Sequence, residues 1–244
     1  AADGHSINWV DYARGVFAHG DVNNTGTIAV TSVGGTADAN DVTDAYATAY
    51  GVYARDGVNN TGQVTAFAAG GTATGDEADG GAIAYGIYAQ GDVNNTGTIT
   101  VVGQAQDGFT SHVYGVYMDA DGSLTNTGII RTVGDETYEG CVASGTTTLV
   151  DTYNVTLDGD PSQASFFIAD GATLALNDAT LTVSDVEGES RWNTRYRLFA
   201  IDSNGVVDGN FADVRAVNPD VDAFYYTQGT SNVVDDTVSL GYSP

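Results

Sequence analysis

The chain has no lysine, and its 32 acidic residues face only seven basic ones, all arginine, which gives a formal net charge of −25 over 244 residues. A chain with this balance is repelled by phosphate backbones, which argues against nucleic-acid binding. Electrostatic attachment to an anionic membrane surface is disfavoured for the same reason. The acidity is typical of a solubilised, extended surface, and the alternative is a surface that binds divalent cations or a cationic partner.

Cysteine and long apolar runs are scarce as well. The single cysteine, Cys141, excludes an internal disulfide framework, and its neighbours Gly140 and Val142 favour a small buried residue over a reactive thiol. No apolar run approaches the roughly 20 residues that a membrane-spanning helix needs. The start of the chain has no basic segment followed by an apolar stretch, so no signal peptide is expected to remain there. Stability is therefore expected to come from packing rather than from crosslinks.

The chain contains a fourfold repeat. Its copies are GVFAHGDVNNTGTIAV from Gly15, GVYARDGVNNTGQVTA from Gly51, GIYAQGDVNNTGTITV from Gly86 and GVYMDADGSLTNTGII from Gly115. The first glycines of successive copies are 36, 35 and 29 residues apart, from 51−15, 86−51 and 115−86. A period of this length indicates one supersecondary unit stacked on copies of itself.

Each copy predicts three short strands. One lies around the first glycine, as in residues 50–54, one is marked by the apolar residue before Asn-Asn, and one alternates apolar and polar residues, as in 27–31. Asn-Asn-Thr-Gly is turn chemistry, because asparagine and glycine tolerate left-handed backbone angles. Three strands per repeat without helical periodicity predict an all-β fold, a parallel β-helix or solenoid. The Ala- and Gly-rich insertions at 34–47 and 70–82 are expected as loops or as an extra flexible strand.

Stacking of the coils predicts ladders of equivalent residues. Two apolar ladders are expected inside: Val16, Val52, Ile87 and Val116 on one wall, and Ile28, Val64, Ile99 and Ile130 on another. A structural ladder of asparagines, bonded from coil to coil through their side-chain amides, is expected at a corner: Asn24, Asn60, Asn95 and Asn126. We interpret the Asn-Asn-Thr-Gly motif as this corner rather than as a ligand site.

Four aromatic residues have the opposite parity to the inner valines and are expected to line up outside: Phe17, Tyr53, Tyr88 and Tyr117. One interpretation is a surface contact strip that stacks sugar rings or contacts a partner. The other is an aromatic ladder that stabilises the stack or is covered by the insertions. The second is favoured, because sizeable exposed apolar patches are rare unless they are used.

The repeat ends near Cys141, and two regions are expected: repetitive β-helix coils at 1–140, and further coils with a C-terminal capping region at 141–244. In the second region, Asp170-Gly171 and Asn177-Asp178 are expected as tight turns between longer strands. The cationic segment 191–197 is expected to pair with the surrounding carboxylates. A terminal cap would cover the last open layer of the core, as a solenoid needs.

The order of these motifs resembles a known family. The motifs are the repeats Gly-Val-Tyr-Ala…Val-Asn-Asn-Thr-Gly-Thr-Ile, then the segments 168–174, 196–199, 205–211 and 238–240. They are similar to the passenger domains of bacterial autotransporters, the type V secretion proteins, and the last three segments are similar to the autochaperone-like junction of such passengers. The resemblance implies a right-handed parallel β-helix, displayed or released outside a diderm bacterium and present here without the membrane barrel.

No residue pattern points to catalysis. The histidines His5, His19 and His112 stand outside nucleophile motifs, and Gln90 replaces His19 two coils later. Carboxylates are abundant, but no spacing singles out a pair for glycoside chemistry. No catalytic or cofactor-binding residues are assigned, and no cofactor is expected. Calcium stays open, because the acidic segments 38–41 and 235–236 offer oxygen ligands, although no EF-hand or nonapeptide array is present.

Three functions are compatible with these patterns. The leading hypothesis is a non-enzymatic structural or adhesive protein, secreted or at the cell surface, whose partners are other copies of itself or surface glycans and proteins. Its ends are candidates for end-to-end stacking into filaments, because an exposed coil offers unpaired backbone groups. The alternatives are a carbohydrate-active enzyme, a polysaccharide lyase or hydrolase on the same scaffold, and a calcium-dependent binding module. This chain is not expected to insert into a membrane.

Overall fold

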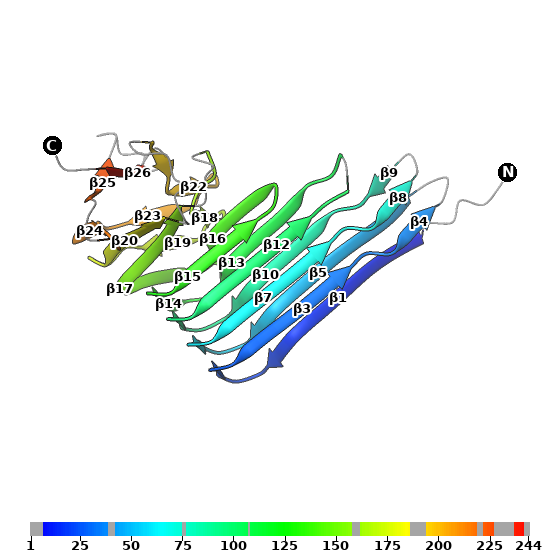
Figure 1. Cartoon of the computed structure of the whole chain (residues 1–244), viewed down its shortest axis with the longest axis horizontal. Helices are drawn as coiled ribbons and strands as arrows, with labels where there is room; N and C mark the ends of the chain where they lie inside the picture. The colour runs from blue at the N-terminus through cyan, green and yellow to red at the C-terminus, as the bar shows by residue number, and fades with distance from the viewer. Residues whose placement is uncertain are drawn as a thin grey trace.

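Every regular element is a β-strand in the part of the chain that the computed structural model describes, which comprises residues 7–38, 42–74, 77–106, 108–157, 162–185, 194–218, 222–226 and 237–241. Equivalent strands of successive repeats pair in parallel and stack along one axis (Figure 1). The chain is therefore a parallel β-solenoid, which confirms the predicted fold class.

Sheet A runs along the whole stack and holds the strands that begin each coil. In spatial order these are β1 (Ile7–Ala18), β5 (Val42–Ala54), β10 (Ala82–Ala89), β13 (Ser111–Asp119), β16 (Glu136–Ser144), β18 (Phe166–Ile168) and β22 (Phe199–Ile201). The short strand β9 (Glu77–Asp79) also pairs with β5. The continuation through β16, β18 and β22 shows that coils extend beyond the end of the sequence repeat.

Two further sheets complete the coils. Sheet B contains β2 (Val22–Asn24), β6 (Val58–Asn60), β11 (Val93–Asn95), β14 (Gly122–Asn126), β17 (Thr146–Leu157), β19 (Thr173–Ala175) and β23 (Val206–Asp208), with β20 (Thr180–Asp185) paired to β17 and β24 (Asp213–Ala216). Sheet C contains β3 (Thr27–Val33), β7 (Gln63–Ala69), β12 (Thr98–Gln104) and β15 (Ile129–Val133). Asn-Asn-Thr-Gly connects sheet B to sheet C in three of the coils, at the predicted corner.

The predicted apolar ladders form the core. Val52 pairs with Val16 on one side and with Ile87 on the other, and Ile87 pairs with Val116. Opposite them, on sheet C, the register aligns Ile28, Val64, Ile99 and Ile130. These side chains are at most 1% exposed, apart from Val16 and Ile28 in the first coil, which are half-buried. Burial of apolar surface from coil to coil therefore holds the stack together.

Each long strand of sheet A bends at its repeat glycine. Gly51 and Val52 both face the core, so Tyr50 and Tyr53 lie on the same outer face although they are three residues apart. A Cβ on Gly86 would lie 2.4 Å from Cγ2 of Ile99 and 2.5 Å from the carbonyl oxygen of Gly115. The bend therefore needs glycine because the sheet C side chains and the next coil approach so closely.

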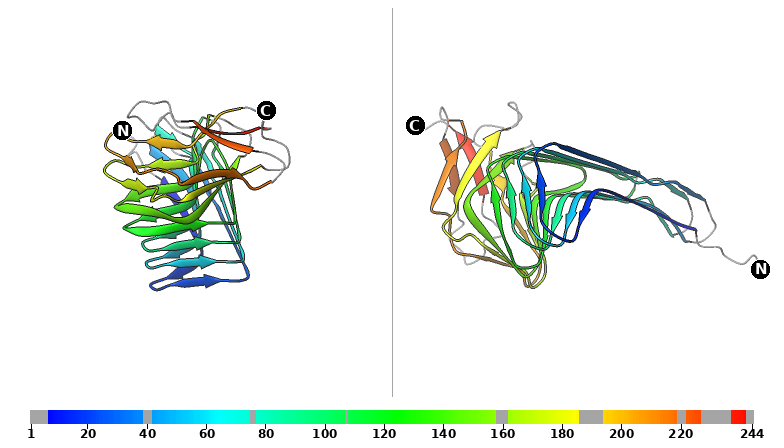
Figure 2. Two further views of the ribbon diagram at one scale, coloured as in Figure 1. Left: turned by 90° about the vertical axis from the view of Figure 1, so that its left-hand side faces the viewer. Right: turned by 90° about the horizontal axis from the view of Figure 1, so that it is seen from below.

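The described residues of the two insertions lie largely in strands, which is one of the two predicted forms. They extend sheet A and add a two-stranded sheet of β4 (Thr36–Asp38) and β8 (Thr72–Thr74). The facing residues in this part are alanines without solvent exposure: Ala45, Ala47, Ala49, Ala66 and Ala68. Such small side chains let sheets A and C approach closely. The cross-section of the coils is therefore wide at one side and tapers to a thin arm at the other (Figure 2, right).

The C-terminal region combines coils with one antiparallel sheet. Gly171, Asn177 and Asp178 have positive φ angles of 73°, 49° and 52°, which confirms the two predicted tight turns. Three strands form the antiparallel sheet, in the order β21 (Tyr196–Arg197), β26 (Thr237–Gly241) and β25 (Asp222–Tyr226). The capping role of this region stays a prediction. Cys141 is 2% exposed, as expected, and burial raises the pKa of its thiol.

Candidate interaction surfaces of the solenoid

The asparagine ladder lies at the corner between sheets B and C. The Nδ2 of Asn24 donates to Oδ1 of Asn60 over 2.7 Å, Asn60 donates likewise to Asn95 over 2.7 Å, and Asn95 to Asn126 over 2.8 Å. The ladder ends on the main-chain oxygen of Asn154, 2.7 Å from Asn126 Nδ2. All four side chains of the predicted ladder are buried, so the row is a structural element of the corner.

The predicted aromatic strip is a continuous stack on the outer face of sheet A. Phe17 stacks on Tyr53 with ring centroids 5.2 Å apart, Tyr53 on Tyr88 at 4.6 Å, and Tyr88 on Tyr117 at 5.1 Å. The planes of each pair lie within 22° of parallel. Phe17, in the first coil, is the most exposed of the four at 46%, and the others are half-buried.

A second aromatic column runs beside the first and was not predicted from the sequence. It consists of Tyr50, Tyr85, Tyr114 and Tyr138, whose neighbouring rings stack at 4.7, 5.3 and 5.9 Å. The two columns meet edge to face, as in Tyr50 and Tyr53 at 76° and Tyr85 and Tyr117 at 87°. We call the two columns together the aromatic plate. The recurring Tyr-Gly-[Val/Ile]-Tyr sequence is the signal that marks it.

Coil spacing explains this arrangement. Coils repeat about every 4.8 Å along the solenoid axis, whereas stacked ring planes are in contact at about 3.5 Å. The normal of each ring plane therefore has to tilt by roughly 43° from the solenoid axis. Opposite tilts in the two columns produce the near-perpendicular planes between them. Within each column, the faces of neighbouring rings cover one another. This geometry supports the stabilising interpretation of the strip and offers few free faces on which a sugar ring would stack.

Burial within the plate raises the pKa of several of its tyrosines. Burial raises the pKa of Tyr117 to about 12, and it raises the pKa values of Tyr85 and Tyr114 as well. The pKa of Tyr88 is raised by burial and by the hydrogen bond that its hydroxyl donates to Asp119 Oδ2. In the first coil Arg14 takes the place of the tyrosine, and its guanidinium lies 5.5 Å from the ring centroid of Tyr50.

The outer face of sheet C is uncharged apart from one arginine. It is formed by alternate residues of β3, β7, β12 and β15, beginning with Thr27, Gln63, Thr98 and Ile129. Most of its residues are threonine, alanine and valine, and Arg131 is the single charged one. Val33 and Val133 on this face are 55% and 57% exposed. Beside it an open groove of about 590 Å³ is lined by threonines and glycines of the corner.

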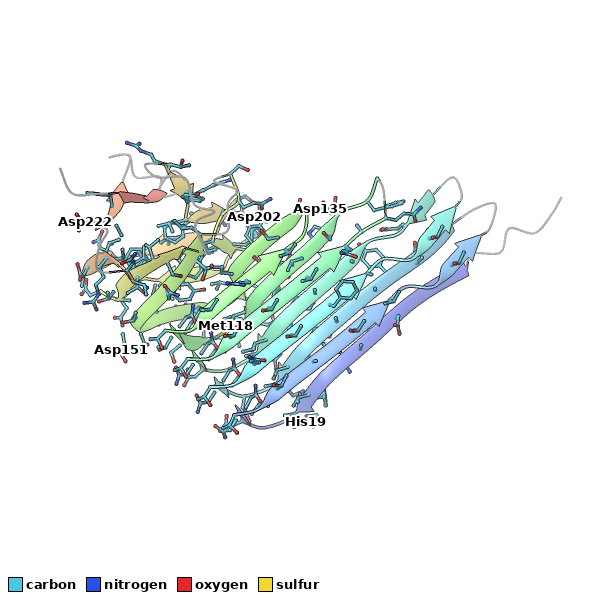
Figure 3. The ribbon with its side chains drawn as sticks, in the orientation of Figure 1. His19, Met118, Asp135, Asp151, Asp202 and Asp222 are labelled. Carbon is cyan, nitrogen blue, oxygen red and sulfur yellow. The ribbon has the colours of Figure 1, made fainter. Side chains whose placement is uncertain are left out.

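Carboxylates gather elsewhere on the coils. Figure 3 shows Asp151 at the lower left edge of the molecule, several coils away from His19, and Asp135 at the opposite ends of the strands. At the turns between sheets A and B, Asp21 accepts the N–H of Gly57 over 2.9 Å, and Asp92 accepts that of Ser123 over 2.8 Å. These acids therefore satisfy main-chain donors of the next coil.

The residues considered for chemistry lie apart. His19 is exposed and contacts Phe17 edge to face, whereas Nδ1 of His112 lies 3.0 Å from Glu136. His5 and the acidic segments 39–41 and 235–236 lie outside the described residues. Within the described ranges, no three His, Cys, Asp or Glu side chains are grouped so that they could hold a metal ion, and no helix is long and apolar enough to cross a membrane.

One buried carboxylate breaks the repeat. Glu139 stands in the fifth coil where earlier coils have glycine, since Tyr138 aligns with Tyr114 and Gly140 with Val116. It is 5% exposed, and its Oε1 accepts the N–H of Thr156 over 2.6 Å. A cavity of about 20 Å³ beside it has room for about one water molecule. This geometry identifies Glu139 as a structural acceptor for a main-chain donor.

No family model matches the chain, and no curated protein or solved structure matches it either.

Proposed function

We propose that this protein is a non-enzymatic structural or adhesive β-solenoid that acts through repeated surface contacts. The observation that carries the proposal is the periodic surface of the aromatic plate, whose rings repeat from coil to coil. A solenoid with such rows offers an extended surface on which weak contacts add up to useful avidity.

The place of action is part of the same proposal. Secretion or cell-surface display by a diderm bacterium is supported by the order of the sequence motifs, which resembles that of autotransporter passengers. The stack of parallel coils is compatible with that resemblance, and the acidic, lysine-free composition suits a large exposed surface.

End-to-end assembly would require pairing at an open edge. In the described part of the chain, β1, β2 and β3 pair on one side only, which favours stacking at this end. Two charges weigh against it. Asp11 stands where the next coil has Ala47 and bonds to Ser32, and Arg14 stands where the next coil has Tyr50. Charges in such positions on an edge strand discourage further pairing.

The proposal is tested by coating beads with the folded protein and measuring bead aggregation and adhesion to immobilised cell-surface glycans and proteins. An unrelated acidic protein of similar net charge is the control. We expect adhesion or aggregation above this control. Release of reducing ends from a polysaccharide without adhesion would instead support the enzyme alternative, and a melting temperature lowered by a chelator would support the calcium-dependent module.

A further inference from the structure

The geometry points to the outer face of sheet C as a self-association surface that packs against the same face of a second copy. This inference rests on the proposed structural or adhesive function and names its partner. Two sheets packed face to face in this way would form a two-fold, self-complementary interface.

The outer face of sheet C differs in charge from the rest of the molecule. Two molecules of net charge −25 repel each other through most of their surfaces. The outer face of sheet C has no carboxylate, and Arg131 is the single charge on it. Two copies that meet through this face avoid the like charges that would separate them elsewhere.

The outer face of sheet C also combines aliphatic and hydroxyl side chains. Val33, Ile129 and Val133 on the outer face are 55%, 39% and 57% exposed. The aliphatic residues on the inner face of the same strands are buried or half-buried. The threonine side chains between them make no hydrogen bond within the described part of the molecule, so their hydroxyls are available to a partner. An exposed face that mixes aliphatic groups with free hydroxyls suits a sheet-on-sheet contact.

The area of the face sets the strength of the contact. Four strands of up to seven residues span roughly 19 by 23 Å, or about 400 Å² for each partner. Stable interfaces bury about 800 Å² for each partner. We therefore expect a weak dimer that strengthens on a crowded surface, where many copies face one another.

Sedimentation velocity over a protein concentration series tests the inference. We expect a reversible dimer whose association becomes stronger as salt rises from about 0.02 M to about 0.5 M, because salt screens the repulsion of the acidic surfaces. Thr65→Glu with Thr100→Glu places two carboxylates at the centre of the face and should weaken association about tenfold or more. Far-UV circular dichroism verifies that the variant is folded.

The matched control adds the same two charges outside the face. Asn59→Glu with Asn94→Glu alters exposed residues at the corner of the same two coils and should leave association nearly unchanged. Equal loss in both variants would show that net charge, not this face, controls association, and would overturn the inference. A wild-type protein that stays monomeric at about 1 mM and high salt would overturn it as well.

A crosslinking experiment gives an independent reading. Thr100→Cys puts a thiol at the centre of the face, and Asn94→Cys puts one at the corner of the same coil, while the native Cys141 is buried. The face variant should form disulfide-linked dimers faster under mild oxidation, and equal rates would contradict the inference. Bead adhesion by a monomeric protein would leave the proposed function standing while this inference fails.

Discussion

Nδ2 of Asn60 donates a hydrogen bond to Oδ1 of Asn95 over 2.7 Å, and both side chains have no solvent exposure. The preceding asparagine of each pair behaves differently. Nδ2 of Asn94 lies 3.3 Å from Oδ1 of Asn59, and both of these side chains are exposed. Each Asn-Asn pair therefore contains one structural and one dispensable amide.

Asn60→Ala should destabilise the solenoid by about 2–4 kcal/mol, because it removes the buried acceptor of Asn24 and the buried donor to Asn95. Asn59→Ala is the matched control and should change the free energy of unfolding by about 0.5 kcal/mol or less. Urea unfolding followed by far-UV circular dichroism measures both. Similar effects of the two substitutions would contradict the structural role of the ladder.

Gly86→Ala should destabilise the chain by about 3 kcal/mol or more, because the new methyl group would overlap Ile99 and the carbonyl oxygen of Gly115. Gly26→Ala serves as the control, since a Cβ at Gly26 has no neighbour within 4 Å. The control should be nearly neutral in the same unfolding experiment. A well-tolerated Gly86→Ala would show that the bend of sheet A does not depend on close approach.

The tyrosines of the aromatic plate should make the protein less stable in alkali. Tyrosines of the unfolded chain ionise near pH 10, whereas burial raises the pKa of Tyr117 to about 12 and raises that of Tyr85 further. Above pH 10 the unfolded state therefore binds fewer protons than the folded state, and the free energy of unfolding falls with pH. Below pH 10 this contribution is fully present.

Urea unfolding between about pH 9 and pH 11 measures this loss, and absorbance of tyrosinate in the folded protein gives the ionisation directly. Folded-state ionisation of all tyrosines near pH 10 would contradict the account of the plate.

Asp11→Ala with Arg14→Tyr should convert the exposed edge of β1 to the chemistry of an internal coil. The two substitutions give β1 the residue types of Ala47 and Tyr50 and remove both charges. We expect new association into species larger than dimers, visible by sedimentation velocity and electron microscopy. Unchanged association would show that these charges do not prevent pairing at the edge of β1. The double substitution removes one acid and one arginine and leaves the net charge at −25, so a change in association would not come from net charge.

The sequence predicts much of this architecture because its repeat is strict where the backbone turns. Asn60 and Asn95 lie at identical places in their copies, so stacking alone predicts their contact. The same logic places Tyr53 above Tyr88.

The second aromatic column was missed for a definable reason. A period of two residues puts Tyr50 and Tyr53 on opposite faces of a strand, and the bend at Gly51 brings them to the same face. The close packing of the arm was not predicted, because segments rich in alanine and glycine suggest a loop or a flexible strand. Here the small size of these residues lets sheets A and C pack closely.

The length of the solenoid axis and the width of the coils depend on different parts of the sequence. Ile87 pairs with Val116 in the next coil in the same way as Val52 pairs with Ile87. The first pair is 29 residues apart in the sequence and the second is 35 residues apart. Each additional coil lengthens the axis by about 4.8 Å whatever its residue count. Residues gained or lost between the ladders change only the reach of the arm, so such a protein can lengthen or broaden in evolution by independent steps.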